Sequence, residues 1–267
     1  VAFILLGMFC ISANDMAIKE LSRGYPLHQM VFVRSAIAIL FTTVFLQFEG
    51  GFAMLRTARP GLHILRGLLI VFANMAYFAA LAVMPLASAT ALFFVAPLFI
   101  TLLSIPFLGE TVGGRRIAAV AVGFLGVLVV LRPGMGATAE TPPTLVLVLP
   151  VIAAFAYACM QILTRKLGVS SPASAMAFYI QSMFLVVSGV FWLVAGDGRF
   201  AEGIESESAL FLLRAWEWPR DGDWGWFLLL GLMSAVIGYS LSQAYRSADA
   251  ATIAPFEYAA MPLAILW

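Results

Sequence analysis

The sequence predicts an all-α integral membrane protein built from two inverted five-helix repeats. Apolar residues make up 63% of the chain, charged residues only 11%, and the mean hydropathy is +1.00, which is typical of helices surrounded by lipid. The apolar residues fall into runs of about 20, the length that crosses a bilayer as a helix. A third observation is that positions in the first half of the chain recur at fixed spacing in the second half.

Charged and turn-forming residues separate the apolar runs and so delimit the expected helices. We expect membrane helices at residues 1–18, 27–48, 63–83, 86–108, 114–131, 145–164, 173–195 and 224–245, and a ninth that begins near residue 250. The connections at Met84-Pro85 and at 247–249 are only a few residues long, so each should join an antiparallel pair of helices. The turn-rich stretch RPGMGATAETPP begins the predicted linker, residues 132–144, between repeats at 1–131 and 145–267.

The internal repeat is visible when the two halves are aligned. An offset of 146 pairs residues of the same kind: Lys19 with Arg165, Leu21 with Leu167, Pro26 with Pro172, Met30 with Met176 and Phe32 with Phe178. Farther along, the offset grows to 164 and 165, which pairs Gly67 with Gly231 and Pro97 with Pro262. The offset grows because the second half carries a long insertion at about 197–223.

The odd number of helices in each repeat determines how the repeats are related. A unit with five spans ends on the side of the membrane opposite its start, so the second copy must be inserted upside down. The halves should therefore be related by a pseudo-two-fold axis in the membrane plane. The counterpart of the helix at 114–131 would fall beyond residue 267, so we expect a tenth helix in the intact protein.

The orientation in the membrane is predicted from lysine and arginine residues in the short connections. With the N-terminus in the cytoplasm, the cytoplasmic side holds Arg56, Arg59, Arg66, Arg115, Arg116, Arg165, Lys166 and Arg246, against Lys19, Arg23, Arg34 and Arg132 outside. The long loop at about 197–223 would then be extracytoplasmic. Trp216 and Trp218 in this loop would either lie flat at the membrane interface or belong to an ordinary solvated loop.

Two sequence motifs resemble those of a known family. Each half has a stretch of small residues that leads to a proline, and in the first half FLGE follows at 107–110. These features resemble the EamA type of the drug/metabolite transporter superfamily, and AYRSADAATIAPFEY at 244–258 is most similar to the YddG-type aromatic amino acid exporters. The resemblance implies ten helices, a central cavity, and export of amino acids of broad range, aromatic ones included, by alternating access across a bacterial inner membrane.

Several other function classes lack support in the sequence. There is no phosphate-binding loop, metal-ligand cluster or nucleophile–base spacing, and the two histidines, His28 and His63, lie near the ends of predicted helices. We therefore expect no enzyme activity, no cofactor and no metal. The net charge of +1, without a basic run, gives no basis for nucleic-acid binding. The expected partners are the lipid bilayer and a small-molecule substrate, and a monomer is compatible with the sequence.

Two alternatives to amino acid export remain open at this point. One is transport of another small metabolite or drug within the same superfamily. The other is a different class of function, a membrane scaffold or a receptor. A carrier requires a polar path between the halves that reaches one side of the membrane, whereas a scaffold requires none.

Polar residues at membrane depth are the candidate substrate-binding residues, because leaving them in lipid is unfavourable. Asn14 and Asp15 lie in the first predicted helix, and the offset of 146 places Gln161 opposite Asp15 in the sixth. Further candidates share helix faces at spacings of three or four, or could stack on an aromatic substrate: Asn74, Tyr77, Phe93, Tyr157, Tyr239, Gln243 and Phe256. The alternative for each is an interhelical hydrogen bond or ordinary packing.

Glu257 is the most unusual candidate, because its counterpart in the first repeat is Leu92. In one interpretation it lies near the cytoplasmic end, where it meets water or Arg246, while Asp15 pairs with Lys19. In the other, one of the two acids titrates during transport or holds the ammonium group of a substrate.

Two prolines at equivalent positions are candidate hinges. Pro97 and Pro262 each remove a hydrogen bond within a helix, which permits a kink and leaves a carbonyl that a neighbour or a cavity must satisfy. They are interpreted either as hinges that bend during transport or as static kinks required for packing.

Overall fold

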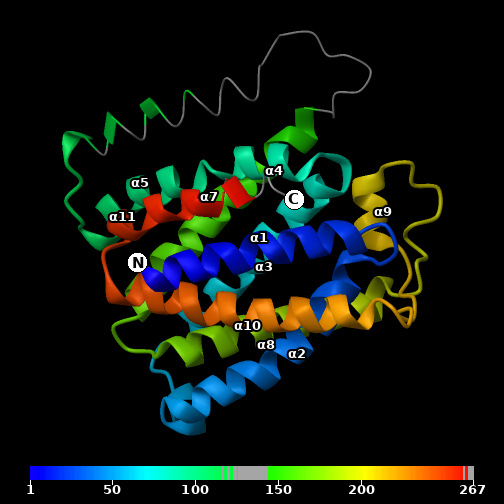
Figure 1. The fold of residues 1–267 in the computed structure, drawn as a ribbon, viewed down its shortest axis with the longest axis horizontal. Helices are drawn as coiled ribbons and strands as arrows, with labels where there is room; N and C mark the ends of the chain where they lie inside the picture. The colour runs from blue at the N-terminus through cyan, green and yellow to red at the C-terminus, as the bar shows by residue number, and fades with distance from the viewer. Residues whose placement is uncertain (116, 119–120, 123–124, 126–143, 261, 264–267) are drawn as a thin grey trace.

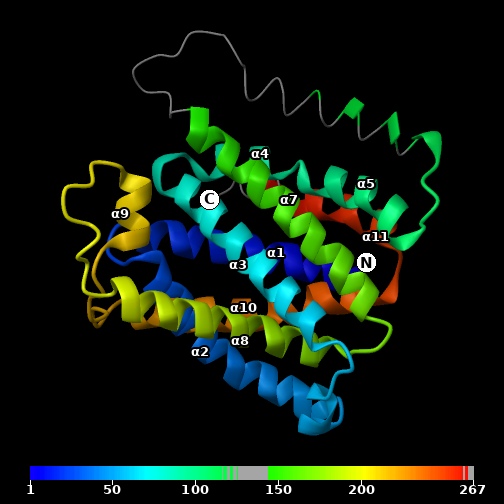
Figure 2. The ribbon, with the colours of Figure 1, turned by 180° about the vertical axis from the view of Figure 1, so that it is seen from behind.

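A computed structural model describes residues 1–115, 117–118, 121–122, 125, 144–260 and 262–263. Every regular element in these ranges is a helix (Figures 1 and 2). In chain order they are α1 (Ala2–Leu21), α2 (Leu27–Phe48), η1 (Gly51–Leu55), α3 (Pro60–Val83), α4 (Leu86–Phe93), α5 (Ala96–Leu108), α7 (Thr144–Leu167), α8 (Ala173–Ala195), α9 (Glu207–Leu213), α10 (Trp224–Ser247), α11 (Ala250–Ile253) and η2 (Ala254–Ala259).

The described residues contain 7 helical segments long and apolar enough to cross a membrane. They confirm the predicted all-α membrane fold, and their bounds lie within a few residues of those expected. The predicted helix at 114–131 lies largely outside the described residues. The ninth begins at Ala250 as expected, with α11 followed directly by the 3₁₀ helix η2.

Equivalent residues of the two halves occupy equivalent places at the helix ends. Leu21 and Leu167, paired by the offset of 146, are the last residues of α1 and α7. Pro26 and Pro172 stand directly before α2 and α8, with nearly the same extended backbone (φ −71°, ψ 150° and φ −69°, ψ 159°). Because proline fixes φ and lacks an N–H, it suits this position, where a donor would have no partner within the helix.

Helices from opposite halves pack against each other in equivalent pairs. Helix α1 packs along α10, and its counterpart α7 packs along α3, while α2 lies against α8 (Figures 1 and 2). Gly67 of α3 lies so close to Met183 of α8 that an added Cβ would be 2.8 Å from its Cγ. Its counterpart Gly231 of α10 lies equally close to Ile37 of α2. Each of these contacts between the halves thus has a counterpart in which the two halves have exchanged roles. This arrangement is expected of two halves related by a two-fold axis.

The predicted helix at 86–108 forms one of the 7 apolar segments, Ser88–Leu108, but it is interrupted between α4 and α5. Helix α4 ends at Phe93 and α5 begins at Ala96. Pro97 lies in the first turn of α5; it lacks an N–H, and its ring would clash with the carbonyl four residues earlier in a continuous helix. The break therefore falls between Phe93 and the proline.

Two arginines that the orientation argument placed in connections lie inside the bundle. Arg34 is in α2 and Arg66 is in α3, and their exposed fractions are 4% and 2%. Helix α3 starts at Pro60, earlier than predicted, so Arg66 lies well within it. Both guanidinium groups have polar partners on other helices, which the sequence of one helix does not reveal.

The long loop lies at the end of the bundle opposite the N-terminus (Figure 1). Gln29 of α2 holds it by two hydrogen bonds with the backbone of Glu217, at 2.5 and 3.1 Å. The ring of Trp216 packs against Phe32, with centroids 5.4 Å apart, whereas Trp218 is 85% exposed. Trp216 therefore anchors the loop to α2, whereas the position of Trp218 at a membrane interface stays a prediction.

Candidate functional site

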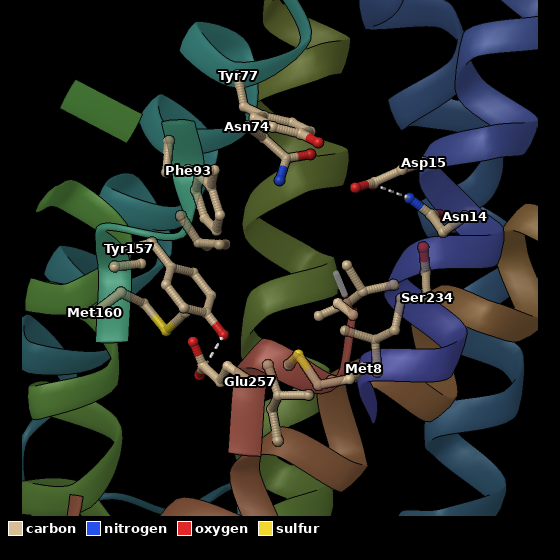
Figure 3. A pocket seen from close by; sticks show the side chains of 18 of the residues that line it. Met8, Asn14, Asp15, Asn74, Tyr77, Phe93, Tyr157, Met160, Ser234 and Glu257 are labelled. Carbon is tan, nitrogen blue, oxygen red and sulfur yellow. Dashed lines mark hydrogen bonds between the residues drawn. The ribbon is translucent and has the colours of Figure 1, made fainter. Parts of the chain in front are cut away.

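A cavity of about 160 Å³ lies between the two halves (Figure 3). Nine of the residues singled out from the sequence line it: Asn14, Asp15, Asn74, Tyr77, Phe93, Pro97, Tyr157, Gln161 and Glu257. They come from α1, α3, α4, α5, α7 and η2, so both halves contribute to the wall. Apolar side chains such as Met8, Met160 and Ile237 line much of the rest.

Three predicted residues lie elsewhere. Tyr239 donates a hydrogen bond to Glu49 at 2.9 Å, between α10 and the end of α2. Gln243 accepts a bond from Arg246 on its own helix at 3.4 Å, and Phe256 is 36% exposed. Spacing along a helix shows which residues share a face, but not which neighbouring helix that face meets.

One end of the cavity is a polar cluster around Arg34. This guanidinium donates from Nη2 to Asn74 Oδ1 at 2.6 Å and, more weakly, from Nη1 to Asn14 Oδ1 at 3.5 Å. Asn14 Nδ2 in turn donates to Asp15 Oδ1 at 3.5 Å. The Arg34 Cζ atom lies 5.1 Å from the centroid of the Phe184 ring, a cation–π contact. The amide side chain of Asn14 therefore lies between the Arg34 guanidinium and the Asp15 carboxylate.

The other end of the cavity contains Glu257, which is only 4% exposed. Its Oε1 accepts hydrogen bonds from two phenols, Tyr157 Oη at 3.0 Å and Tyr245 Oη at 2.5 Å. Gln161 Nε2 donates to the Tyr157 hydroxyl at 2.6 Å and so holds it in place. The interpretation in which Glu257 pairs with Arg246 is wrong, because its partners are these buried tyrosines.

An aromatic wall runs between the two ends. Tyr77 packs edge-to-face on Phe93, with centroids 5.2 Å apart, and Phe93 packs against Tyr157 at 5.4 Å. The Tyr77 hydroxyl shares a 3.0 Å hydrogen bond with Thr90 on α4. Figure 3 shows Asn74 and Asp15 pointing toward each other at one end of the cavity, and Tyr157 with Glu257 at the other. A bound molecule would thus meet flat apolar faces between polar ends.

Arg66 also lines the cavity and joins four helices. From α3 it donates to Thr164 Oγ1 of α7 at 2.7 Å, to the Met176 carbonyl of α8 at 2.9 Å and to Ser242 Oγ of α10 at 3.1 Å. All three acceptors are neutral oxygens from the second half. Arg66 therefore links the two halves beside the cavity by three charge-assisted hydrogen bonds.

Sequence reasoning missed several polar residues of the wall. They are Ser12, Arg34, Arg66, Thr90, Gln181, Ser234 and Ser242. The two arginines could have been found, since both fall inside predicted spans, where a charged residue indicates function by default. The serines and threonines could not, because such residues occur throughout membrane helices as local hydrogen-bond donors to the backbone.

Known proteins resemble the chain along its length. The model of the EamA-like transporter family matches residues 1–132. A riboflavin transporter of Rhizobium johnstonii is 33% identical over 247 residues, which are 91% of this chain and 72% of that protein. The chain belongs to the EamA-like transporter family. It is thus a multi-pass membrane transporter of a small molecule and not an enzyme.

Two further comparisons support this placement. An S-adenosylmethionine uptake transporter of Rickettsia felis is 27% identical over 262 residues, 97% of this chain and 79% of that protein. A protein crystal structure aligns with a TM-score of 0.70 at 19% identity, over 99% of this chain and 86% of that one. This last similarity concerns the fold alone. The two relatives are named as transporters of riboflavin and of S-adenosylmethionine, and neither is named as a transporter of amino acids.

We expect Tyr157→Phe to reduce transport about tenfold, because it removes a hydrogen bond to a buried acid, typically worth about 1.5–3 kcal/mol. Tyr239→Phe is the matched control, since it deletes a hydroxyl bonded to a glutamate outside the cavity. The measurement is the initial rate of transport in liposomes that contain equal amounts of protein. Each variant is first shown to elute as a single monodisperse peak in detergent. Equal rates for the two variants would contradict a role of the Tyr157 end of the cavity in transport.

Proposed function

We propose that this chain is a secondary carrier whose substrate site is the cavity between the halves, and that it carries small amphipathic solutes with an aromatic ring and charged groups. The observation that carries the proposal is the order of groups in the cavity wall. A cationic cluster at Arg34 and an acid at Glu257 lie at opposite ends of a wall made by Tyr77, Phe93 and Tyr157.

Export of amino acids, aromatic ones included, is the first candidate within this class. An aromatic amino acid carries a carboxylate, an ammonium group and a ring in one small molecule. Arg34 can bind the carboxylate, because its guanidinium has only amide oxygens as hydrogen-bond partners and its Nε has no partner among the described residues. The ring would pack on the aromatic wall, and Glu257 would face the ammonium group.

Transport of a larger heteroaromatic metabolite is the second candidate, and the relatives favour it. The riboflavin transporter of Rhizobium johnstonii is the more similar of the two curated relatives described above. A flat ring system would use the same stacking surface, with its polar substituents at Asn14, Asn74 and Arg34. The amphipathic class is common to both candidates, and the choice between them is made by experiment.

Alternating access is the proposed mechanism, and contacts between the halves lie at both ends of the bundle. At the N-terminal end, Glu110 after α5 accepts hydrogen bonds from the Ala250 and Ala251 amides at 2.8 and 3.0 Å. At the other end, Tyr25 donates to Asp223 at 2.5 Å. We propose that one set of contacts breaks while the other holds.

The hinge role of the prolines also belongs to this proposal. Pro97 follows the break between α4 and α5 and lines the cavity, so bending there would move the aromatic wall. Pro262 lies in a short described segment at the end of the chain, where its hinge role stays a prediction by analogy with Pro97. In the second half, the regular α-helix gives way to a 3₁₀ helix at Ala254, next to Pro255.

Uptake into liposomes with a panel of solutes tests the proposed function. The panel contains tryptophan, phenylalanine, riboflavin and S-adenosylmethionine, with leucine and a cationic dye for comparison. We expect saturable transport of at least one ring-containing solute at a rate several-fold above that of leucine, because only the ring gains contact with the wall. Transport of leucine as fast as every aromatic member, or of no member at all, would contradict the proposal.

We further propose that the N-terminus is cytoplasmic in a bacterial inner membrane and that the long loop is extracytoplasmic. Arg34 and Arg66 are buried and no longer count. The connection between η1 and α3, which holds Arg56 and Arg59, and the end of α7, which holds Arg165, still lie at the N-terminal end of the bundle (Figure 1). An impermeant maleimide should label Glu202→Cys in intact spheroplasts, but should label Arg56→Cys only after lysis. The reverse pattern would overturn this orientation.

A further inference from the structure

The two buried acids of the cavity differ in what compensates their charge. Asp15 belongs to the cluster in which Arg34 supplies a cation two hydrogen bonds away, through Asn14. Glu257 has no lysine, arginine or histidine nitrogen within 4.0 Å among the described residues. Its hydrogen-bond partners among the described residues are the neutral hydroxyls of Tyr157 and Tyr245. A full negative charge on Glu257 is therefore hydrogen-bonded but not neutralised.

The helices packed on η2 bring no cation within 4.0 Å of Glu257 among the described residues: Lys19 of α1 donates to the carbonyls of Leu81 and Met84. Helices α5 and α11, which pack on η2, carry no ionisable side chain, and η2 itself contributes Tyr258. From α1, the ionisable residue of the cavity wall is Asp15, at the opposite cluster. Arg66 lines the same cavity, but its guanidinium is engaged with three neutral oxygens of α7, α8 and α10. Glu110, beyond the cavity, binds backbone amides at the start of α11.

The two carboxyl oxygens have different environments, and this determines where a proton can bind. Both phenols donate to Oε1, whereas Oε2 has no hydrogen bond with any residue that the structure describes. Glu257 lines the cavity, so Oε2 is the oxygen available to whatever fills it. An unneutralised carboxylate at membrane depth is costly, and a proton on Oε2 removes its charge while both phenol bonds to Oε1 stay intact.

We propose that Glu257 is the coupling-proton site of this carrier, an inference that rests on the proposed transport function. With the cavity free of solute, Oε2 carries a proton. When a solute with a positively charged group enters, that group takes the place of the proton, and the proton leaves to the water on the side to which the cavity is open. One proton is exchanged for one solute, and no covalent bond other than O–H is made or broken.

Infrared spectroscopy tests the site without any substrate. At a pH at which solvent-exposed carboxyl groups are ionised, the purified protein should show the carbonyl stretch of a protonated, buried carboxyl, and Glu257→Gln should remove the Glu257 contribution to this band. The matched control is Asp15→Asn, which removes the other buried acid of the cavity and should keep this band. A band that persists undiminished in Glu257→Gln, or its absence from the wild type wherever the protein is folded, would overturn the proposal.

Transport assays then separate coupling from binding, with tryptophan and S-adenosylmethionine as probes. Glu257→Gln keeps an amide oxygen for the two phenols and imitates the protonated acid. Because it also removes the anion that would hold the positively charged group of the solute, exchange of labelled for unlabelled solute should become slower, and the transport that remains should be the same with and without a pH gradient. Asp15→Asn should still respond to the gradient.

Each other outcome has a defined meaning. A Glu257→Gln variant whose transport still responds to the pH gradient would overturn the proposal, and so would one that exchanges both probes at the wild-type rate, because the positively charged group of the solute would then not replace a proton at Glu257. If the wild type exchanges neither probe, the substrate class under the proposed function fails, and the infrared result alone decides whether Glu257 binds the proton.

Discussion

The structure depends on one constraint, that a polar group at membrane depth must find its partners inside the protein. Arg66 shows the consequence most clearly. Its guanidinium, on α3, is satisfied by a hydroxyl of α7, a carbonyl of α8 and a hydroxyl of α10. These acceptors all belong to the second half. The hydrogen bonds of one side chain from the first half therefore hold three helices of the second half around it. The close contacts at Gly67 and Gly231 allow the same helices to approach.

The cavity follows from the same constraint. Arg34, Asp15 and Glu257 cannot face lipid, so they gather between the halves, where the wall can hold them at separate ends. The aromatic residues between these ends come from α3, α4 and α7, and the break before Pro97 ends α4 at one of them, Phe93. The bundle thus combines hydrogen bonds between the halves at Arg66 with a cavity that has polar ends and an apolar middle.

Much of this fold was predictable, because it depends on length, hydropathy and repetition. The offset that pairs Leu21 with Leu167 and Pro26 with Pro172 places helix ends correctly in both halves. The site was predictable only in part. Tyr239 shares a helix with cavity residues yet faces Glu49 on α2, because helix periodicity does not specify the neighbouring helix. The partners of Arg34 lie on α1 and α3, so only the packed structure shows how its burial is tolerated.

The central claim is that the cavity between the halves is the site at which solute binds during alternating access. Ser234 lines this cavity, and in a version without Cys10 and Cys159 its replacement by cysteine provides one reporter thiol. The decisive measurement is the rate of labelling of Ser234→Cys by an impermeant maleimide, with and without a solute that the liposome panel shows to be transported. We predict labelling that such a solute slows severalfold, while leucine does not. Labelling that is unaffected by every transported solute would contradict the account.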